Sequence, residues 1–191
     1  MPSLNLVPEK TALVLIDLQN GITGYPLVPH TSADVIARAN RLANGLRKKG
    51  ATIVYVRVSM TEIVHRAVDV SMRDPNAPPP PAIASELVAE LDRQPADLVI
   101  TKRQWGAFYG TELDQQLRRR GIQTIVIGGI ATNFGVESTA RAAFDRGYEL
   151  VFVEDAMTTL SAEAHKFAIE AIFPRMGRVR TTDAVLQALE A

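Results

Sequence analysis

Residues 11–17 read TALVLID, an apolar run that closes on a carboxylate and leads into the polar stretch LQNG. A segment that is apolar at nearly every position predicts a strand buried on both faces, as strands of parallel sheets are. Five further strands are predicted from apolar or β-branched runs at residues 52–58, 97–101, 124–129, 148–154 and 178–180. Thus six strands are expected, and the first ends on Asp17.

Helices are predicted between the strands from apolar spacing and capping residues. Ser32 is expected to cap a helix over residues 33–49, which Gly50 stops. Five other helices are expected. Two lie at residues 83–92 and at about 134–146, and a third follows the Thr111-x-x-Asp114 pattern and ends at Gly121. The fourth is capped by Ser161, and the last lies at about 183–189. Strands that alternate with helices indicate a parallel sheet covered on both faces, so residues 1–191 are expected to form a single three-layer α/β/α domain, Rossmann-like in layout.

Composition narrows the function classes. The 191 residues carry 21 basic and 21 acidic side chains, which gives no bulk electrostatic reason to bind nucleic acid or an anionic membrane. Neither a membrane-spanning apolar stretch nor a signal-peptide pattern is present, so a cytoplasmic protein is expected. The chain has no cysteine, which excludes disulfides, thiolate metal sites and a thiol nucleophile.

One long irregular stretch runs from about Ser59 to Ala82 and contains Pro75 and the run Pro78 to Pro81. A polyproline segment is stiff and extended, so the stretch is either a rigid surface connector or a wall or lid over a pocket. Both interpretations remain open from sequence.

Ligands of open α/β sheets bind beyond the carboxyl ends of the strands, near the point where strand order reverses. At those ends the sequence places Asp17, Arg57 and Lys102. Burial is expected to raise the pKa of Asp17 and the Lys102 ammonium to lower it, so the two side chains could move protons near neutral pH. The competing interpretation is that Asp17 only caps a neighbouring loop.

The segment Gly128 to Gly135, GGIATNFG, is a glycine-rich turn that opens onto a helix and could hold an oxyanion or carboxylate. It matches neither dinucleotide nor P-loop patterns, and no nucleotide cofactor is expected. His30, His65 and His165 lack ligand spacing, so no metal site is expected either.

ALVLIDLQNG at residues 12–21, and the segment 102–156 with its Lys, aromatic-x-Gly-Thr-x-Leu and Gly-x-Ala-Thr-Asn motifs, resemble the isochorismatase-like hydrolases, the superfamily that also holds nicotinamidases and carbamoylases. The resemblance spans nearly the whole chain. It implies a six-stranded parallel sheet in order 3-2-1-4-5-6. It also implies a cleft with Asp17 and Lys102 as catalytic residues, a cis peptide between Ile130 and Ala131, and backbone N–H donors at Ala131 and Gly135.

Most relatives have a nucleophilic cysteine where this chain has Gly135, so the acyl-thioenzyme route is excluded here. True isochorismatases also have glycine at that place: their Asp protonates an enol-ether carbon and water traps the oxocarbenium ion. By resemblance, Asp17 would be the general acid, with Lys102 tuning it or holding a substrate carboxylate. Arg57 and Val58 stand where isochorismatases present a Gln, so a carboxylate-bearing small molecule other than isochorismate is expected, with ether or enol-ether cleavage among the reactions.

Two other interpretations remain. The chain is a catalytically silent protein that binds small carboxylates, or it hydrolyses amides through water on Asp17 or through Ser138, one helical turn past Gly135. The aromatic residues Trp105, Phe108, Tyr109 and Phe134 are expected in the pocket, in the core or at a subunit interface. The resemblance implies a homodimer or homotetramer. The candidate substrate-binding residues are Gln19, Arg57, Trp105, Tyr109, Asn133 and Phe134.

Overall fold

The computed structural model describes residues 4–64, 66–72, 74 and 76–190, so His65 and Pro75 lie outside the described residues. Six parallel strands form one sheet in the order β3-β2-β1-β4-β5-β6, which confirms the predicted class and order. The strands are β1 Thr11–Ile16, β2 Thr52–Val58, β3 Leu98–Lys102, β4 Thr124–Ile130, β5 Glu149–Thr158 and β6 Arg178–Arg180. All six residues of β1 are buried, as expected of a central strand.

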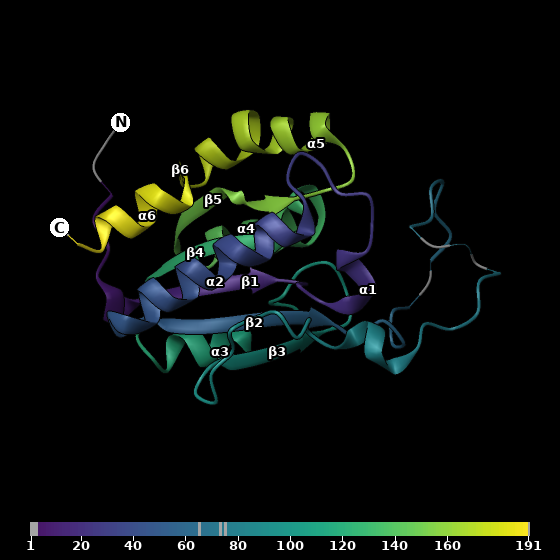
Figure 1. The fold of residues 1–191 in the computed structure, drawn as a ribbon, viewed down its shortest axis with the longest axis horizontal. Helices are drawn as coiled ribbons and strands as arrows, with labels where there is room; N and C mark the ends of the chain where they lie inside the picture. Colours follow the sequence, from purple (N-terminus) through teal and green to yellow (C-terminus); the bar gives the residue numbers. More distant parts are fainter. Residues whose placement is uncertain (1–3, 65, 73, 75, 191) are drawn as a thin grey trace.

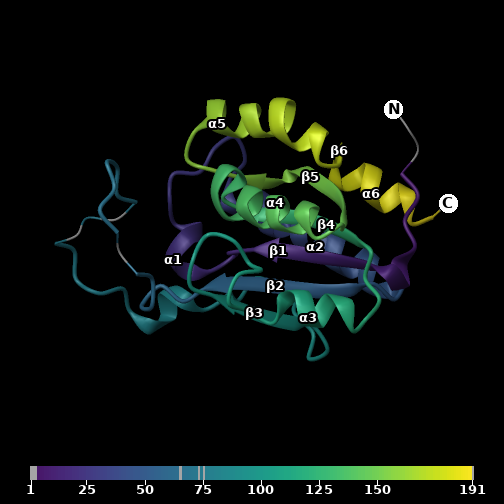
Figure 2. The ribbon, with the colours of Figure 1, turned by 180° about the vertical axis from the view of Figure 1, so that it is seen from behind.

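Helices cover both faces of the sheet. The α-helices are α1 Asn20–Thr23, α2 Ser32–Lys48, α3 Leu113–Arg118, α4 Glu137–Asp145, α5 Ala162–Phe167 and α6 Thr182–Ala188. Helices α2 and α6 pack on the face seen in front in Figure 1, and α3 and α4 on the face seen in front in Figure 2. Each face buries its own apolar cluster, so the molecule has the three layers that the sequence predicts.

Short 3-10 and π turns complete the chain. The 3-10 turns are η1 Pro8–Lys10, η2 Ala82–Ser85 and η5 Phe173–Arg175, and the π turns are η3 Thr132–Val136 and η4 Ala168–Ile172. Turn η3 leads directly into α4, so the single helix expected at about 134–146 is in fact a π turn followed by an α-helix. Such π turns are frequent at functional sites.

Several predicted helix boundaries are wrong. The cap of α2 is Thr31, not Ser32: the Thr31 hydroxyl accepts a hydrogen bond from the N–H of Asp34, whose carboxylate accepts one from the N–H of Thr31. Helix α3 begins at Leu113 without a side-chain cap bond, although Thr111 Oγ1 still accepts from the Leu113 N–H at 3.2 Å. By contrast, the predicted Ser161 cap of α5 is confirmed, because Ser161 Oγ accepts a hydrogen bond from the Ala164 N–H.

The helix predicted at residues 83–92 is also wrong. Only η2 is helical there, and the chain then pairs with the segment that follows β1: Gln19 and Leu87 form an antiparallel bridge, and the Val88 N–H donates to the carbonyl of Leu18 at 3.1 Å. Val88 and Leu91 are buried nevertheless. The apolar spacing therefore predicts the buried positions correctly, while pairing with the segment after β1 overrides helix propensity.

The described residues between β2 and η2 extend away from the body of the molecule in both ribbon views (Figures 1 and 2). The two ends of this stretch are fixed beside the carboxyl end of β1. The Met60 N–H donates to Ser85 Oγ at 2.9 Å, and Gln19 Nε2 donates to the carbonyl of Ala84 at 2.9 Å.

Candidate active site

Asp17 follows β1 in a backbone conformation that residues other than glycine rarely adopt. Its φ is 52°, in the left-handed region that aspartate tolerates better than most residues. Its N–H still bonds the carbonyl of Val56 at 2.8 Å, so the turn begins while the residue remains attached to the sheet. Unusual backbone angles of this kind cluster at functional sites.

Lys102 is the last residue of β3, and its ammonium donates to Asp17 Oδ2 at 2.7 Å. The two side chains reach each other across β2, whose Val56 pairs with Ile16 and whose Val58 pairs with Lys102. Both are nearly sealed from solvent: Asp17 is 5% exposed and Lys102 is 2% exposed. Lys102 also donates to the carbonyl of Gln104 at 3.1 Å.

The other carboxylate oxygen, Asp17 Oδ1, is buried and has no hydrogen-bond partner among the described residues. Burial raises the pKa of Asp17 to about 6, and the charge and hydrogen bond of Lys102 lower it, a smaller effect. A carboxyl group with this pKa exchanges its proton close to neutral pH.

The segment Gly128 to Gly135 lies against the end of β1. Gly129 has a φ of 114°, and a Cβ there would lie 2.2 Å from the Ile16 carbonyl oxygen, so only glycine fits. The peptide between Ile130 and Ala131 is cis, which confirms the expectation from the family resemblance. A Cβ built on Gly135 would lie 3.3 Å from Asp17 Oδ2, so position 135 faces the carboxylate.

Thr132 and His165 form a contact that the sequence did not reveal. Nδ1 of His165, on α5, lies 2.9 Å from Thr132 Oγ1 at the start of η3, and both residues are buried. Burial, and to a lesser extent the charge of His30, lowers the pKa of His165 to about 4, so its imidazole is neutral. The only hint in the sequence is that His165 lies in the first turn after the Ser161 cap.

The aromatic residues are divided between the site and the core. Trp105 and Phe134 meet edge to face, with ring centroids 5.0 Å apart, and the Trp105 carbonyl oxygen would lie 3.5 Å from a Cβ on Gly135. Tyr109 is 80% exposed, whereas Phe108 is buried in the core beside Tyr148. We call the exposed or half-exposed group Trp105, Tyr109 and Phe134 the aromatic rim.

Two other predicted substrate-binding residues, Gln19 and Asn133, form side-chain hydrogen bonds within the protein. Gln19 is fully buried: its Nε2 donates to the carbonyls of Val58 and Ala84, and its Oε1 accepts from the Val58 N–H. Asn133 Oδ1 accepts a hydrogen bond from Thr159 Oγ1 at 2.6 Å. Ser138, from the amide-hydrolysis alternative, lies on α4 against the backbone of Gly106.

Arg57 is not brought to the Asp17–Lys102 pair. Alternation along β2 places it on the face of Ile53 and Tyr55, whereas Lys102 shares the opposite face with Ile100. Arg57 donates to Glu86 at 2.6 Å and to Thr101 Oγ1 at 3.1 Å. With Arg103 and others it lines a separate polar cavity of about 410 Å³.

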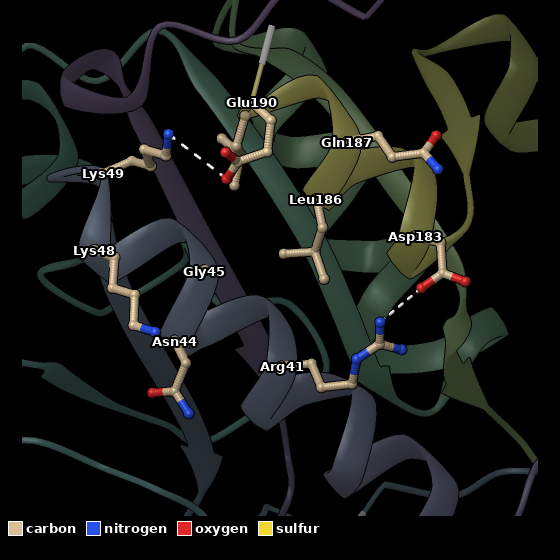
Figure 3. Close-up of a pocket in the computed structure, with 10 residues that line it drawn as sticks. Arg41, Asn44, Gly45, Lys48, Lys49, Asp183, Leu186, Gln187 and Glu190 are labelled. Carbon is tan, nitrogen blue, oxygen red and sulfur yellow. Dashed lines mark hydrogen bonds and ion pairs between the residues drawn. The ribbon is translucent and has the colours of Figure 1, made fainter.

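A larger groove, of about 620 Å³, lies between α2 and α6 (Figure 3). Its lining residues are Arg41, Asn44, Gly45, Lys48, Lys49, Asp183, Leu186, Gln187, Leu189 and Glu190. Two of its cations pair with carboxylates across the groove, Arg41 with Asp183 at 2.7 Å and Lys49 with Glu190 at 3.6 Å. The groove lies beside the end of α2 that leads into β2. It is therefore near the amino ends of the strands, whereas Asp17 lies at their carboxyl ends.

No group of three potential metal ligands occurs among the described residues. Two of the three histidines, His30 and His165, lie near each other, with ring centroids 6.0 Å apart. Within the described part of the chain, no helix is both long and apolar enough to cross a membrane.

Comparisons with known proteins agree with the fold described above. Residues 11–184 match the isochorismatase domain. An isochorismatase family protein of Bacillus subtilis is 46% identical over 98% of both chains. A phenazine biosynthesis protein of Pseudomonas aeruginosa is 30% identical over 96% of this chain and 88% of that one. The solved structure of an isochorismatase family protein from Burkholderia thailandensis, 45% identical, superimposes with a TM-score of 0.90 over 98% of both chains.

Proposed function

Because this chain belongs to the isochorismatase family of hydrolase folds, we propose that it hydrolyses a carboxylate-bearing small molecule without a covalent intermediate. Asp17 is the general acid and base of this reaction, and Lys102 sets its proton affinity. The observation that carries the proposal is the buried Asp17 carboxyl group, which has a pKa of about 6. Its Oδ2 lies beside position 135, which has no side chain, and its Oδ1 has no hydrogen-bond partner within the described structure.

Ether or enol-ether cleavage suits this arrangement. For an enol ether, protonated Asp17 transfers its proton to the terminal carbon of the double bond, and the ether carbon becomes an oxocarbenium ion. A water molecule adds to that carbon and returns one proton to the Asp17 carboxylate. The hemiketal then breaks its C–O bond, and its hydroxyl proton passes to the leaving oxygen, which gives an alcohol and a ketone. No side-chain nucleophile takes part, which agrees with a chain that has no cysteine.

Lys102 acts on Asp17 in this scheme rather than on the substrate. Lys102 is 2% exposed, and its ammonium already bonds Asp17 Oδ2 and the Gln104 carbonyl. The backbone N–H groups of Ala131 and Gly135 are the proposed donors to the substrate carboxylate or to a developing oxyanion. Trp105 and Phe134 supply the adjoining apolar wall.

The test is a panel of vinyl ethers, esters and amides that carry carboxylates, with wild type, Asp17→Asn and the surface control Asp183→Asn. General acid catalysis is worth about 10²- to 10⁴-fold, so Asp17→Asn should lose at least a hundredfold in kcat/KM. Asp183 is an exposed residue of the groove between α2 and α6, so Asp183→Asn should leave kcat/KM unchanged. Undiminished turnover in Asp17→Asn would remove Asp17 from the mechanism.

Two features support a second function: Asp17 and Lys102 are both buried, and position 135 is a glycine. A protein that keeps Asp17 and Lys102 buried and offers no nucleophile fits a binder of small carboxylates. A binder should be stabilised thermally by a carboxylate that mass spectrometry finds unchanged after long incubation. Turnover of the same compound decides for the hydrolase.

A further inference from the structure

Thr139, on α4, has a hydroxyl group that the proposed reaction does not use. The residue is 1% exposed, and its hydroxyl donates to the carbonyl of Gly135 at 2.7 Å. The hydroxyl oxygen also accepts a hydrogen bond from the N–H of Ala107 at 3.1 Å. The first bond is the common contact of a helical threonine with the carbonyl four residues back. The second bond is different, because it joins α4 to a segment 32 residues away in the chain.

Ala107 lies in the loop of residues 103–112, which links β3 to α3 and carries Trp105 of the aromatic rim. Ala107 is fully buried, and its N–H is bonded to Thr139. A Cβ on the preceding residue, Gly106, would lie 3.6 Å from a backbone carbonyl oxygen of α4, so this part of the loop packs on the helix. The hydroxyl of Thr139 therefore fixes the loop to the helix that follows η3.

The beginning of the same loop is attached to the Asp17–Lys102 pair. The Lys102 ammonium donates to the carbonyl of Gln104 at 3.1 Å as well as to Asp17 Oδ2. Gln104 Nε2 in turn donates to the carbonyl of Gly106 at 3.0 Å, so the turn is bonded within itself. The loop is thus held at two places, by Lys102 at the sheet and by Thr139 at α4.

The two segments that Thr139 joins both border position 135. A Cβ at this position would lie 3.3 Å from Asp17 Oδ2 and 3.5 Å from the carbonyl oxygen of Trp105. Thr139 bonds the Gly135 carbonyl on one side and the loop that carries Trp105 on the other. One buried hydroxyl therefore connects two walls of the space beside the Asp17 carboxylate.

We propose that Thr139 is a positioning residue: its hydroxyl sets the distance between the Trp105 loop and Gly135, and so the width of the space in which a bound molecule meets Asp17. The inference rests on the proposed function, because this width affects a rate only if Asp17 exchanges a proton with the bound molecule. Thr139 is not itself a nucleophile, since it is buried and its hydroxyl forms both bonds. A displacement of about 1 Å can cost about a hundredfold in rate.

Thr139→Val tests this role while it keeps the shape of the side chain. The valine leaves the buried N–H of Ala107 without its partner, so the loop has to move to hydrate it. Thr139→Ala removes the hydroxyl as well, in case the valine impairs folding, and Thr139→Ser keeps it. Thr11→Val is the matched control: Thr11 is fully buried at the amino end of β1, and its hydroxyl donates to the carbonyl of Val7, also four residues back, at 2.8 Å.

The fluorescence of Trp105 reports on the loop without any substrate, because Trp105 is the chain's single tryptophan. Its ring meets Phe134 edge to face, with centroids 5.0 Å apart, so its anisotropy in wild type should decay mainly with rotation of the whole protein. Thr139→Val and Thr139→Ala should add a fast local component on the picosecond-to-nanosecond scale. Thr139→Ser and Thr11→Val should give the wild-type decay.

A thiol at position 135 reports on the space itself. The chain has no native cysteine, so mass spectrometry can follow the alkylation of a Gly135→Cys variant by iodoacetamide. Adding Thr139→Val should make alkylation several-fold faster, because the Trp105 carbonyl then no longer lies close to the position. Adding Thr139→Ser or Thr11→Val instead should leave the rate unchanged.

Turnover distinguishes this inference from the proposed function. With the panel compound that wild type hydrolyses fastest, Thr139→Val should lower kcat about tenfold with little change in KM, and Thr139→Ser should restore it. Undiminished turnover in Asp17→Asn would end the proposed chemistry, while the fluorescence and thiol measurements would still decide whether Thr139 holds the loop. Anisotropy and alkylation that are the same in Thr139→Val as in Thr11→Val would overturn the inference, as would an unchanged kcat in a variant whose loop is released.

Discussion

Gly135 faces the carboxylate of Asp17: a Cβ at position 135 would lie 3.3 Å from Asp17 Oδ2 and 3.0 Å from Ile16 Cγ2. The glycine leaves room for a small group directly beside the acid. The family resemblance places the thiol nucleophile of other members at this position, so we expect the site to have the layout of a thiol hydrolase without the thiol.

Gly135→Cys should therefore introduce an unusually reactive thiol. Asp17 Oδ2 would lie 3.3 Å from the new Cβ, where it can accept the thiol proton, and the Lys102 ammonium that bonds this oxygen favours the thiolate. Ile16 has to shift only a few tenths of an ångström to admit the Cβ. We expect alkylation by iodoacetamide at pH 7 about tenfold faster than for Gly24→Cys, a control position where a Cβ would meet nothing within 4 Å. Since the chain has no other cysteine, mass spectrometry reads the rate directly. Equal rates would show that the site no longer activates a thiol.

Lys102→Met should move the pH dependence of hydrolysis upward. Protonated Asp17 is the active form, so wild-type activity should fall as pH rises through about 6. The Lys102 ammonium lowers the pKa of Asp17, and its removal should shift the fall to higher pH. The pH–rate profile of Lys49→Met, a surface control, should coincide with that of wild type. A Lys102→Met profile that moves to lower pH is the result that this account does not permit.

Gln19→Ala should destabilise the fold, because Gln19 ties β2 to η2. Its removal leaves the buried N–H and carbonyl of Val58 and the carbonyl of Ala84 without their partner. We expect a loss of about 3 kcal/mol in the free energy of unfolding, measured in urea. Gln187→Ala, on the exposed side of α6, should stay within about 0.5 kcal/mol of wild type. A stable Gln19→Ala variant that has lost only substrate affinity would restore Gln19 as a binding residue.

His165→Gln should make the free energy of unfolding less dependent on pH in the acidic range. The pKa of His165 is lowered to about 4 from an ordinary value of 6.5, so the unfolded chain takes up this proton first as pH falls. The stability that neutral His165 contributes is full above about pH 6.5 and is lost as pH falls toward 4. We expect wild type to lose on the order of 1 to 3 kcal/mol more than His165→Gln between pH 7 and pH 4.5, by urea titration. Identical losses would place the destabilising proton elsewhere.

The sheet was predictable from sequence, because long apolar runs separated by helices leave few arrangements. The meeting of Asp17 and Lys102 was expected from the family motifs and follows from the parallel register, in which Val58 pairs with Lys102 and Val56 with Ile16. The backbone turn at Asp17, with its φ of 52°, has no signature in the sequence.

Two site assignments required the structure. Arg57 and Lys102 both lie in the last two residues of a strand, but which face each side chain takes depends on a register that composition does not encode. Gln19 follows Asp17 by two residues and is polar, so it suggested substrate binding, whereas its side chain is hydrogen-bonded to Val58 of β2 and to Ala84 of η2. Long-range pairing decided both cases.

The most direct test of the central claim is the titration of Asp17 itself. Carboxyl carbon NMR of protein labelled at aspartate, with Asp17→Asn used to assign the resonance, should give an apparent pKa near 6 for wild type. A value at or below about 4, the ordinary range of an exposed aspartate, would mean that Asp17 is a fixed anion paired with Lys102 and cannot donate a proton at neutral pH.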